Sequence, residues 1–210
     1  MSQNRVIEAL TRTHFAVPVI MYYVAGIAFL TYAAVYTDLN MLHALYMVPI
    51  GLMVFTFVEY LIHRFLFHFE AKSESQKKIK YNIHGVHHEY PKDKDRLVMP
   101  PLFSIGLAVA FYYLFNFLMG QYALFFFPGF LAGYSTYLLI HYAVHRYRPP
   151  RNFLSYLWKH HSLHHYKSEN TAYSVSFPLW DIMFGTMPFK GKKRDKNAEN
   201  KLPDYHTKVA

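Results

Sequence analysis

Residues 17–36 (VPVIMYYVAGIAFLTYAAVY) run for twenty positions without a charged side chain. Because the hydrocarbon core of a bilayer is about 30 Å thick, about 20 apolar residues of helix are needed to cross it. Comparable apolar blocks occur three more times. We therefore predict an all-α fold with four transmembrane helices, at about residues 17–36, 41–62, 98–119 and 122–143. The alternative for the first block, a cleaved signal sequence, is disfavoured by its length and by the span that follows it closely.

Lysine and arginine are unevenly distributed around these blocks. Of the 22 basic residues, two lie in residues 1–15, eight in residues 64–97 and twelve in residues 146–210, whereas the short connections 37–40 and 120–121 have none. The positive-inside rule then places both termini and the middle loop in the cytoplasm. The basic loops are interpreted as orientation signals that also attract anionic lipid headgroups, and nucleic-acid binding is not indicated.

The chain of 210 residues is expected to form one integral-membrane domain over residues 1–189. Residues 190–210 are charged and lack hydrophobic periodicity, so a disordered tail is predicted there. The sequence has no cysteine, which excludes disulfides, cysteine-ligated iron–sulfur clusters and thiolate-ligated haem. A redox protein of this composition must hold a metal through nitrogen and oxygen.

Eleven of the fourteen histidines fall into four short clusters. Three clusters contain i, i+4 or i, i+3, i+4 spacings, which place imidazoles on one helix face about 5–6 Å apart at Cβ. Imidazole is a common ligand for iron, zinc and copper. Because the clusters offer more ligands than one metal can use, we predict a two-metal centre, at the cytoplasmic edge of the spans. The clusters are His63 and His68; His84, His87 and His88; His141 and His145; and His160, His161, His164 and His165.

Two features of these clusters stay open at the level of the sequence. His63 and His68 are five residues apart, so either the helix ends between them or it contains a π-bulge, and the two need not bind the same metal. In the last cluster His161 is favoured as a ligand over His160, because it repeats the i, i+3, i+4 pattern. The isolated histidines, interpreted as interfacial, packed or tail residues, are His14, His43 and His206.

Carboxylates near the clusters are candidates to accept the second ring N–H of a ligand histidine, which fixes its tautomer. Glu59 lies four residues before His63 on the same helix face, and its alternative role is an interfacial salt bridge. Asp181 is a candidate either to orient a ligand or to cap a helix. Weaker acidic candidates are Glu89 and Asp93. The aromatic candidates, for which packing is the alternative, are Tyr137 for a hydrogen bond near the metals and Tyr134 and Tyr142 for a substrate channel.

Three stretches of the sequence resemble a known family. They are residues 57–68 (FVEYLIHRFLFH), residues 84–101 (HGVHHEYPKDKDRLVMPP), and the run 164–167 (HHYK) with its continuation 174–186 (SVSFPLWDIMFGT). Over about residues 55–187 the chain resembles the membrane fatty acid hydroxylase superfamily, and within it the fatty acid 2-hydroxylases that act on sphingolipids.

The resemblance implies a four-helix transmembrane bundle with a cytoplasmic helical cap around a dimetal site. It also implies O₂-dependent insertion of a hydroxyl group at C2 of a long fatty acyl chain, free or in a lipid. Two iron ions are the expected cofactors, and zinc is expected to be able to replace them in a purified protein. The ligands that it implies are His63, His68, His84, His87, His88, His141, His145, His161, His164 and His165.

Two departures from the family pattern are visible. Fungal and animal members carry an N-terminal haem domain with a His-Pro-Gly-Gly motif that this sequence lacks, so electrons are expected from a separate reductase or haem protein. Leu138 stands where those members often have an aspartate, which removes one polar contact near the third cluster. The alternative functions are a sterol, carotenoid or alkane oxygenase on the same scaffold and, less favoured, a metal transporter.

Overall fold

The computed structural model describes residues 13–188 of the chain, apart from the side chain of Arg96. All regular structure in this part is helical, which confirms the predicted all-α class for the described residues. The predicted disordered tail and His206 lie outside them.

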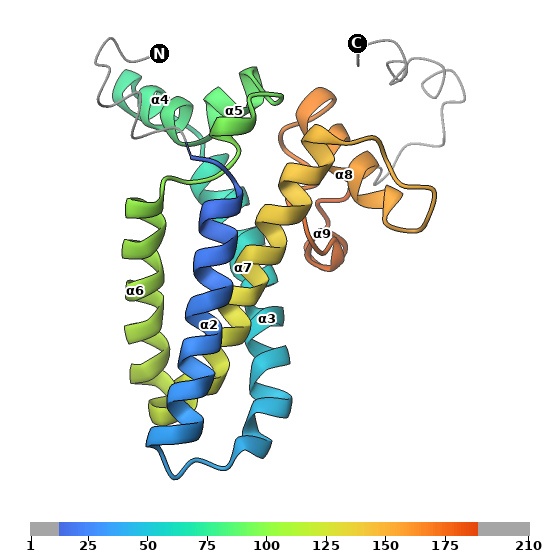
Figure 1. Ribbon diagram of the computed structural model, residues 1–210. Helices are drawn as coiled ribbons and strands as arrows, with labels where there is room; N and C mark the ends of the chain where they lie inside the picture. The colour runs from blue at the N-terminus through green and yellow to red at the C-terminus, as the bar shows by residue number, and fades with distance from the viewer. Residues whose placement is uncertain (1–12, 189–210) are drawn as a thin grey trace.

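Four long helices form an elongated bundle: α2 (Ala16–Tyr36), α3 (Ala44–Leu61), α6 (Pro101–Met119) and α7 (Ala123–Arg146) (Figure 1). Helix α7 lies at its centre and packs along both α2 and α3. The shorter α-helices are α4 (Glu74–Lys80), α5 (Val86–Glu89), α8 (Ser155–Tyr166) and α9 (Leu179–Met183). The remaining helical turns are the π-helices η2 (Ile62–Phe67) and η3 (Tyr81–Gly85) and the 3₁₀ turns η1 (Met41–His43), η4 (Lys94–Arg96) and η5 (Gly120–Tyr122).

Three helical stretches are long and apolar enough to cross a membrane: Ala16–Tyr36, Met41–Phe67 and Pro101–Arg146. The third contains both α6 and α7, between which the chain reverses at Gly120 (Figure 1). Gly120 has a φ of +59°, which glycine adopts without a steric penalty. Two long helices therefore occupy this stretch, while the number of membrane crossings stays a prediction.

The core of the bundle depends on close contact between α3 and α7. A Cβ atom on Gly51 would lie 2.0 Å from the Phe126 carbonyl oxygen, and one on Gly129 would lie 1.9 Å from the Val48 carbonyl oxygen. Glycine at these positions lets the two backbones touch, as small residues do between membrane helices. The contact sets the separation of α7, which carries His141, from α3, which continues directly into η2 with His63.

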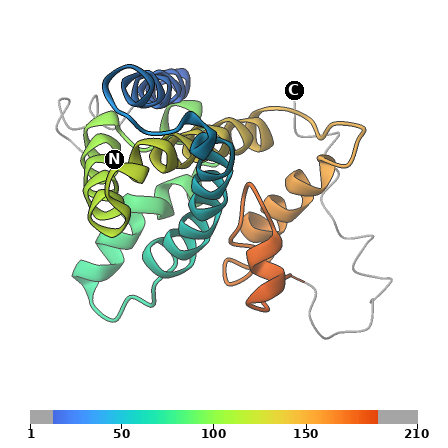
Figure 2. The ribbon, with the colours of Figure 1, turned by 90° about the horizontal axis from the view of Figure 1, so that it is seen from below.

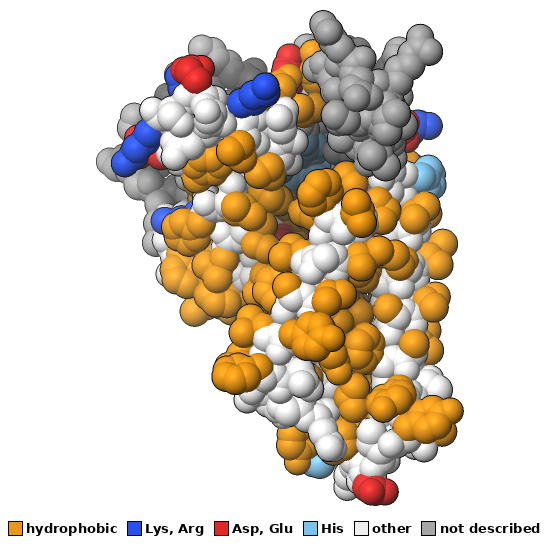
Figure 3. Space-filling model, turned by 90° about the vertical axis from the view of Figure 1, so that its left-hand side faces the viewer, with side chains coloured by type: hydrophobic (Ala, Val, Ile, Leu, Met, Phe, Trp, Pro, Cys, Tyr) orange, Lys and Arg blue, Asp and Glu red, His pale blue; other side chains and the backbone are white. Residues whose placement is uncertain are grey.

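The outer face of the bundle is apolar, and most of the charged side chains visible in Figure 3 lie at one end, with an acidic side chain at the other. That end carries the short α-helices: α4 and α5 lie above the bundle in Figure 1, while α8 lies beside the end of α7 and α9 beside α3 (Figures 1 and 2). Leu138 is 1% exposed and packs with Val19 and Val98. The position at which members of the resembled family often have an aspartate is therefore occupied here by an apolar contact.

Candidate metal centre

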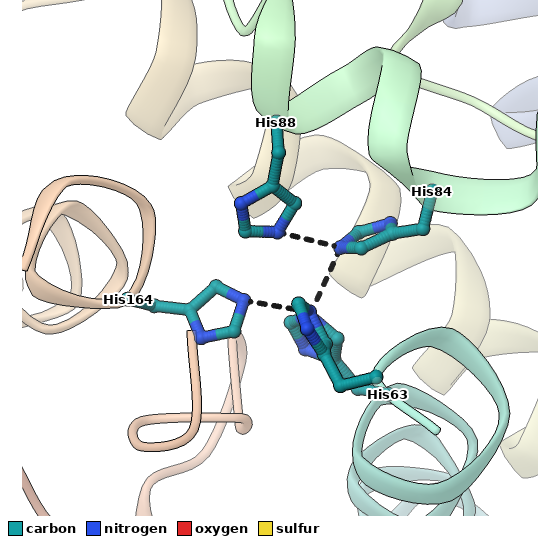
Figure 4. Close-up of side chains that lie close together, drawn as sticks. His63, His84, His88 and His164 are labelled. Atoms are coloured by element: carbon teal, nitrogen blue, oxygen red, sulfur yellow. Dashed lines mark hydrogen bonds between the residues drawn. The ribbon is translucent and has the colours of Figure 1, made fainter. Parts of the chain in front are cut away.

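The ten histidines singled out from the sequence lie together in two groups of five, at the end of the bundle that carries the short helices. In each group every residue offers one nitrogen, and these nitrogens all lie within 4.8 Å of one another. Figure 4 shows rings of the first group pointing toward a common centre. Site A consists of His63, His68, His84, His88 and His164, and site B consists of His87, His141, His145, His161 and His165.

The geometry of both groups fits a metal ion. In site A the Nε2 atoms of His63 and His88 lie 3.1 Å from that of His84, and those of His68 and His164 are 3.0 Å apart. The corresponding Nε2 pairs of site B are separated by 3.1, 2.8 and 3.0 Å. Two nitrogens bound at right angles to one metal, each at about 2.1 Å, lie about 3.0 Å apart. All-imidazole donor sets of this kind suit iron, zinc or copper.

The spacing of five between His63 and His68 is accommodated by the π-helix η2. The backbone N–H of His68 donates to the carbonyl oxygen of His63 at 3.2 Å, and the two ring centroids are 5.0 Å apart. The structure therefore combines both alternatives: the helix contains a π-helical turn, and it ends at Phe67 with His68 as its C-cap. Both histidines join site A, whereas the sequence left open whether they share a metal.

The second and the fourth histidine clusters are each divided between the two sites. His84 and His88 are four residues apart and join site A, while the intervening His87 joins site B. In α8, His161 and His165 join site B, while His164 joins site A. Consecutive residues on an α-helix point about 100° apart, so one helix contributes to two sites that lie side by side. The rings of His88 and His165 stack between the sites, with centroids 4.2 Å apart.

Backbone carbonyl groups fix the tautomers of three of these imidazoles. The Nδ1–H of His141 donates to the Leu97 carbonyl at 3.2 Å, that of His164 donates to the Thr171 carbonyl at 2.8 Å, and that of His63 donates to the Tyr173 carbonyl. Because a carbonyl oxygen can only accept, the proton lies on Nδ1 and the Nε2 lone pair is free for a metal.

Burial keeps the imidazoles outside the long helices neutral. Burial, followed by repulsion from His164 and His88, lowers the pKa of His68 to about 2. Burial also lowers the pKa values of His88 and His164 to about 4. For His84, His87 and His161 the pKa lies well below its ordinary value for the same reason, with neighbouring histidines adding to the shift. Neutral imidazole is the form that binds metals, so the histidines are prepared for ligation at pH 7.

Two buried carboxylates, those of Glu59 and Asp181, accept hydrogen bonds from the loop at residues 173–176, between α8 and α9. Glu59, which is 6% exposed, accepts hydrogen bonds from the backbone N–H groups of Val175 and Ser176 and from the Ser176 hydroxyl. Asp181, which is fully buried, accepts from the backbone N–H groups of Tyr173 and Ser174. The direct contact with an imidazole that was predicted for Glu59 is not among its hydrogen bonds, because its oxygens face this loop.

Asp181 also determines the role of His160. The Nε2–H of His160 donates to Asp181 at 3.0 Å, and His160 belongs to neither site. Burial opposes ionisation of Asp181, but the hydrogen bonds from His160, Thr186 and Ser174 outweigh it and lower the pKa of the carboxyl group. Asp181 therefore contacts a histidine, but not one of the ten in the two sites.

Glu169 is a site residue that the sequence analysis missed. Its carboxylate oxygens lie 3.8 Å from Nδ1 of His68 and 3.9 Å from Nδ1 of His88, and its side chain is 55% exposed. It lines a cavity of about 340 Å³ beside site A, together with Lys80 and Glu89. Glu169 lies four residues after His165, but α8 ends at Tyr166, so Glu169 approaches the site from a loop and not from the same helix face. Its nearness to the last histidine cluster in the sequence is the signal that could have found it. The other weak candidate, Asp93, uses its side chain to cap η4 through the Asp95 N–H.

The tyrosine candidates separate into two kinds. The Tyr137 ring stacks on His141 with centroids 5.4 Å apart, and Tyr134 stacks in turn on Tyr137. These rings extend from site B into the bundle, where an apolar cavity of about 280 Å³ lies between α2, α6 and α7. Tyr142 stacks on Phe15 with centroids 3.8 Å apart, which supports its packing alternative. Two isolated histidines also make ring contacts: His14 with Phe15, and His43 with Tyr46, Tyr122 and Phe125.

The sequence profile described as fatty acid hydroxylase matches residues 48–186, which include both sites. The chain belongs to the fatty acid hydroxylase family. This confirms the resemblance noted from the histidine clusters and the sequence that follows the last one.

Relatives within the fatty acid hydroxylase family act on lipids, according to their names. The dihydroceramide fatty acyl 2-hydroxylase FAH1 of Arabidopsis thaliana is 37% identical over 142 residues, which cover 67% of this chain and 60% of that protein. The ceramide very long chain fatty acid hydroxylase SCS7 of Saccharomyces cerevisiae is 36% identical over 190 residues, covering 86% of this chain and 47% of that protein. The chain thus spans less than two thirds of the length of these relatives.

A solved structure has the same fold. The hydroxylase domain seen in the structure of full-length scs7p superposes with a TM-score of 0.80 at 34% sequence identity. The match covers 90% of this chain and 72% of that one. The arrangement of bundle and short helices is therefore shared with that protein.

Proposed function

We propose that the chain is an O₂-dependent membrane monooxygenase that hydroxylates C2 of a long fatty acyl chain, either free or in a lipid. The observation that carries the proposal is the pair of adjacent five-histidine sites at the end of an apolar bundle. The names of the relatives give the acyl position and the lipid class.

The two sites would hold two iron ions, one bound by the site A histidines and one by the site B histidines. When bound, such a pair supplies the redox chemistry that activates O₂ toward an unactivated C–H bond. The protein contributes neutral imidazoles, tautomers fixed by backbone carbonyls and a largely buried environment that limits access of water.

The apolar surroundings support a lipid substrate. The outer face of the bundle is covered by hydrophobic side chains, and Figure 3 shows a hollow in this face with histidine side chains visible in its depth. We propose that the acyl tail approaches from the lipid while the polar head stays beside the short helices. Tyr134 and Tyr137 lie between site B and the apolar part of the bundle, where they are candidates to contact the chain.

The orientation in the membrane and the source of electrons belong to the same proposal. α2, α3, α6 and α7 would each cross the bilayer, with both termini and both metal sites on the cytoplasmic side, as the basic residues indicate. Conversion of a C–H bond and O₂ into an alcohol and water consumes two electrons and two protons. A separate reductase or haem protein is therefore proposed as the electron donor.

The proposal is tested with purified, iron-loaded protein in lipid, supplied with O₂, a chemical reductant and either ceramide or a free fatty acid. Mass spectrometry should detect acyl chains hydroxylated at C2. We expect His87→Ala to lower the rate by at least about 100-fold, because it removes a site B ligand. His43→Gln, at the opposite end of the bundle, is the matched control and should retain activity.

Undiminished 2-hydroxy product from His87→Ala would refute the proposal. Hydroxylated sterol, carotenoid or alkane in place of 2-hydroxy lipid would assign the scaffold to the alternative substrates. Metal flux into sealed vesicles without any lipid product would instead identify a transporter.

A further inference from the structure

Residues 171–176, between α8 and α9, face site A with two of their carbonyl groups. The Thr171 carbonyl accepts the Nδ1–H of His164 at 2.8 Å, and the Tyr173 carbonyl accepts that of His63. His63 and His164 come from helices about 100 residues apart in the chain, and their ring centroids are 4.5 Å apart. One short loop therefore orients two imidazoles of the same site.

Ala172 stands between these two carbonyls in a left-handed conformation. Its φ is 58°, and among the described residues it is the one non-glycine residue with a positive φ. Its side chain is fully buried. Left-handed backbone is disfavoured for residues with a Cβ atom, so the surroundings must hold it in place.

The N–H groups of the loop show what holds it. Five consecutive backbone N–H groups are bound by acceptors outside the loop, so none competes for the carbonyls that face site A. Asp181 binds two of them and Glu59 binds two more. The pairs are Ala172 with the Thr186 carbonyl at 2.8 Å, Tyr173 with Asp181 Oδ1 at 2.9 Å, Ser174 with Asp181 Oδ2 at 2.8 Å, and Val175 and Ser176 with Glu59 Oε1 at 2.6 and 3.1 Å.

We propose that Glu59, Asp181 and the left-handed Ala172 are positioning residues for site A. They hold the loop so that the Thr171 and Tyr173 carbonyls keep the protons of His164 and His63 on Nδ1 and direct both Nε2 atoms to the metal. Site B is oriented separately, through His141 and the Leu97 carbonyl. The proposal rests on the dimetal centre proposed above and extends it to residues that touch no metal.

The experiment measures metal binding rather than hydroxylation. Wild-type protein in detergent is stripped with a chelator and titrated with Zn²⁺ alone, and bound zinc is determined by elemental mass spectrometry. Two zinc ions per chain are expected for the wild type. Asp181→Asn places an amide NH₂ against the backbone N–H of Tyr173 or Ser174, so it should weaken one of the two sites by about 10- to 100-fold. Glu59→Gln should weaken the same site.

A second substitution identifies the weakened site. In the His145→Ala background, which impairs site B, Asp181→Asn should abolish the remaining tight binding. Ser104→Ala is the control for a lost buried hydrogen bond, since it removes the partner of the Tyr22 hydroxyl within the bundle, and it should keep both zinc sites. Ala172→Gly should also keep both, because glycine adopts the left-handed conformation freely, whereas Ala172→Val should behave like Asp181→Asn.

The proposal is overturned if folded Asp181→Asn and Glu59→Gln proteins, verified by circular dichroism, bind two zinc ions as tightly as the wild type. Equal weakening of both sites would also overturn it, since that outcome indicates a general loss of structure. If a folded Ala172→Val protein keeps two tight zinc sites, Ala172 is not one of the positioning residues. If the wild type binds zinc at two sites but, loaded with iron and supplied with O₂ and reductant, hydroxylates no lipid, the proposed function is refuted and this inference stands.

Discussion

Residues next to one another in the chain belong to different histidine groups. His164 faces site A and is oriented by the Thr171 carbonyl, whereas His165 faces site B and has no hydrogen-bond partner at its buried Nδ1 among the described residues. The carboxylate of Glu169 lies near two histidines of site A. The two sites therefore differ in the groups around their histidines, although each site consists of five imidazoles.

Glu169→Gln should weaken metal binding at site A alone. The carboxylate lies near Nδ1 of both His68 and His88, and its negative charge stabilises a bound cation. Because the side chain is largely exposed and screened, we expect a modest loss of about 3- to 10-fold in Zn²⁺ affinity. Zinc titration of stripped protein measures it. Glu89 lines the same cavity, and Glu89→Gln should lower the zinc affinity by less. Equal losses in the two variants would contradict a specific role of Glu169 at site A.

At the scale of elements, irregular helices and glycine contacts set the geometry. The π-helix η2 brings His63 and His68 together although they are five residues apart, and a second π-helix, η3, contains His84. Such bulges are frequent at functional sites. The closely packed α3 and α7 then define the distance between histidines on different helices.

Gly129→Ala should force α3 and α7 apart. Its Cβ atom would lie 1.9 Å from the Val48 carbonyl oxygen, and a backbone atom cannot move aside as a side chain can. We expect a loss of about 2–3 kcal/mol in stability, seen as a lower unfolding temperature in detergent, together with weaker zinc binding. Gly106→Ala is the matched control, because its Cβ atom would meet nothing within 4 Å. An unfolding temperature of Gly129→Ala at or above that of Gly106→Ala would contradict the packing argument.

At the scale of the whole molecule, polar and apolar surfaces are separated along the bundle. Hydrophobic side chains cover the long helices, while the histidine sites and the short helices lie at one end (Figures 1 and 3). A lipid substrate with a polar head and an apolar tail matches this division.

The proposed four-crossing topology predicts which positions share a side of the membrane. Because the chain has no cysteine, single cysteines can be labelled without background. In sealed vesicles of known orientation, an impermeant maleimide should label Asp38→Cys and Gln121→Cys from one side. Ser75→Cys should react only from the other. Labelling of Gln121→Cys and Ser75→Cys from the same side would show that α6 and α7 are not two separate crossings.

Several properties could be derived from the sequence because they depend on residues close together in the chain. The apolar blocks predict long helices, and i, i+4 spacing predicts that His84 and His88 lie on one helix face. The family followed from contiguous stretches around the histidines, and the family comparison confirms it. The ten histidines were selected from the four histidine clusters, and their role as ligands stays a prediction.

Only the tertiary structure shows how the histidines divide into sites A and B and which groups orient them. The hydrogen bond from Val175 to Glu59 joins residues 116 positions apart, and Glu169 approaches His68 and His88 through a loop. Sequence spacing contains no information about such contacts, because they depend on how helices pack and where loops return. Local helix geometry therefore determined which histidines are candidates, while long-range packing decided which of them share a site.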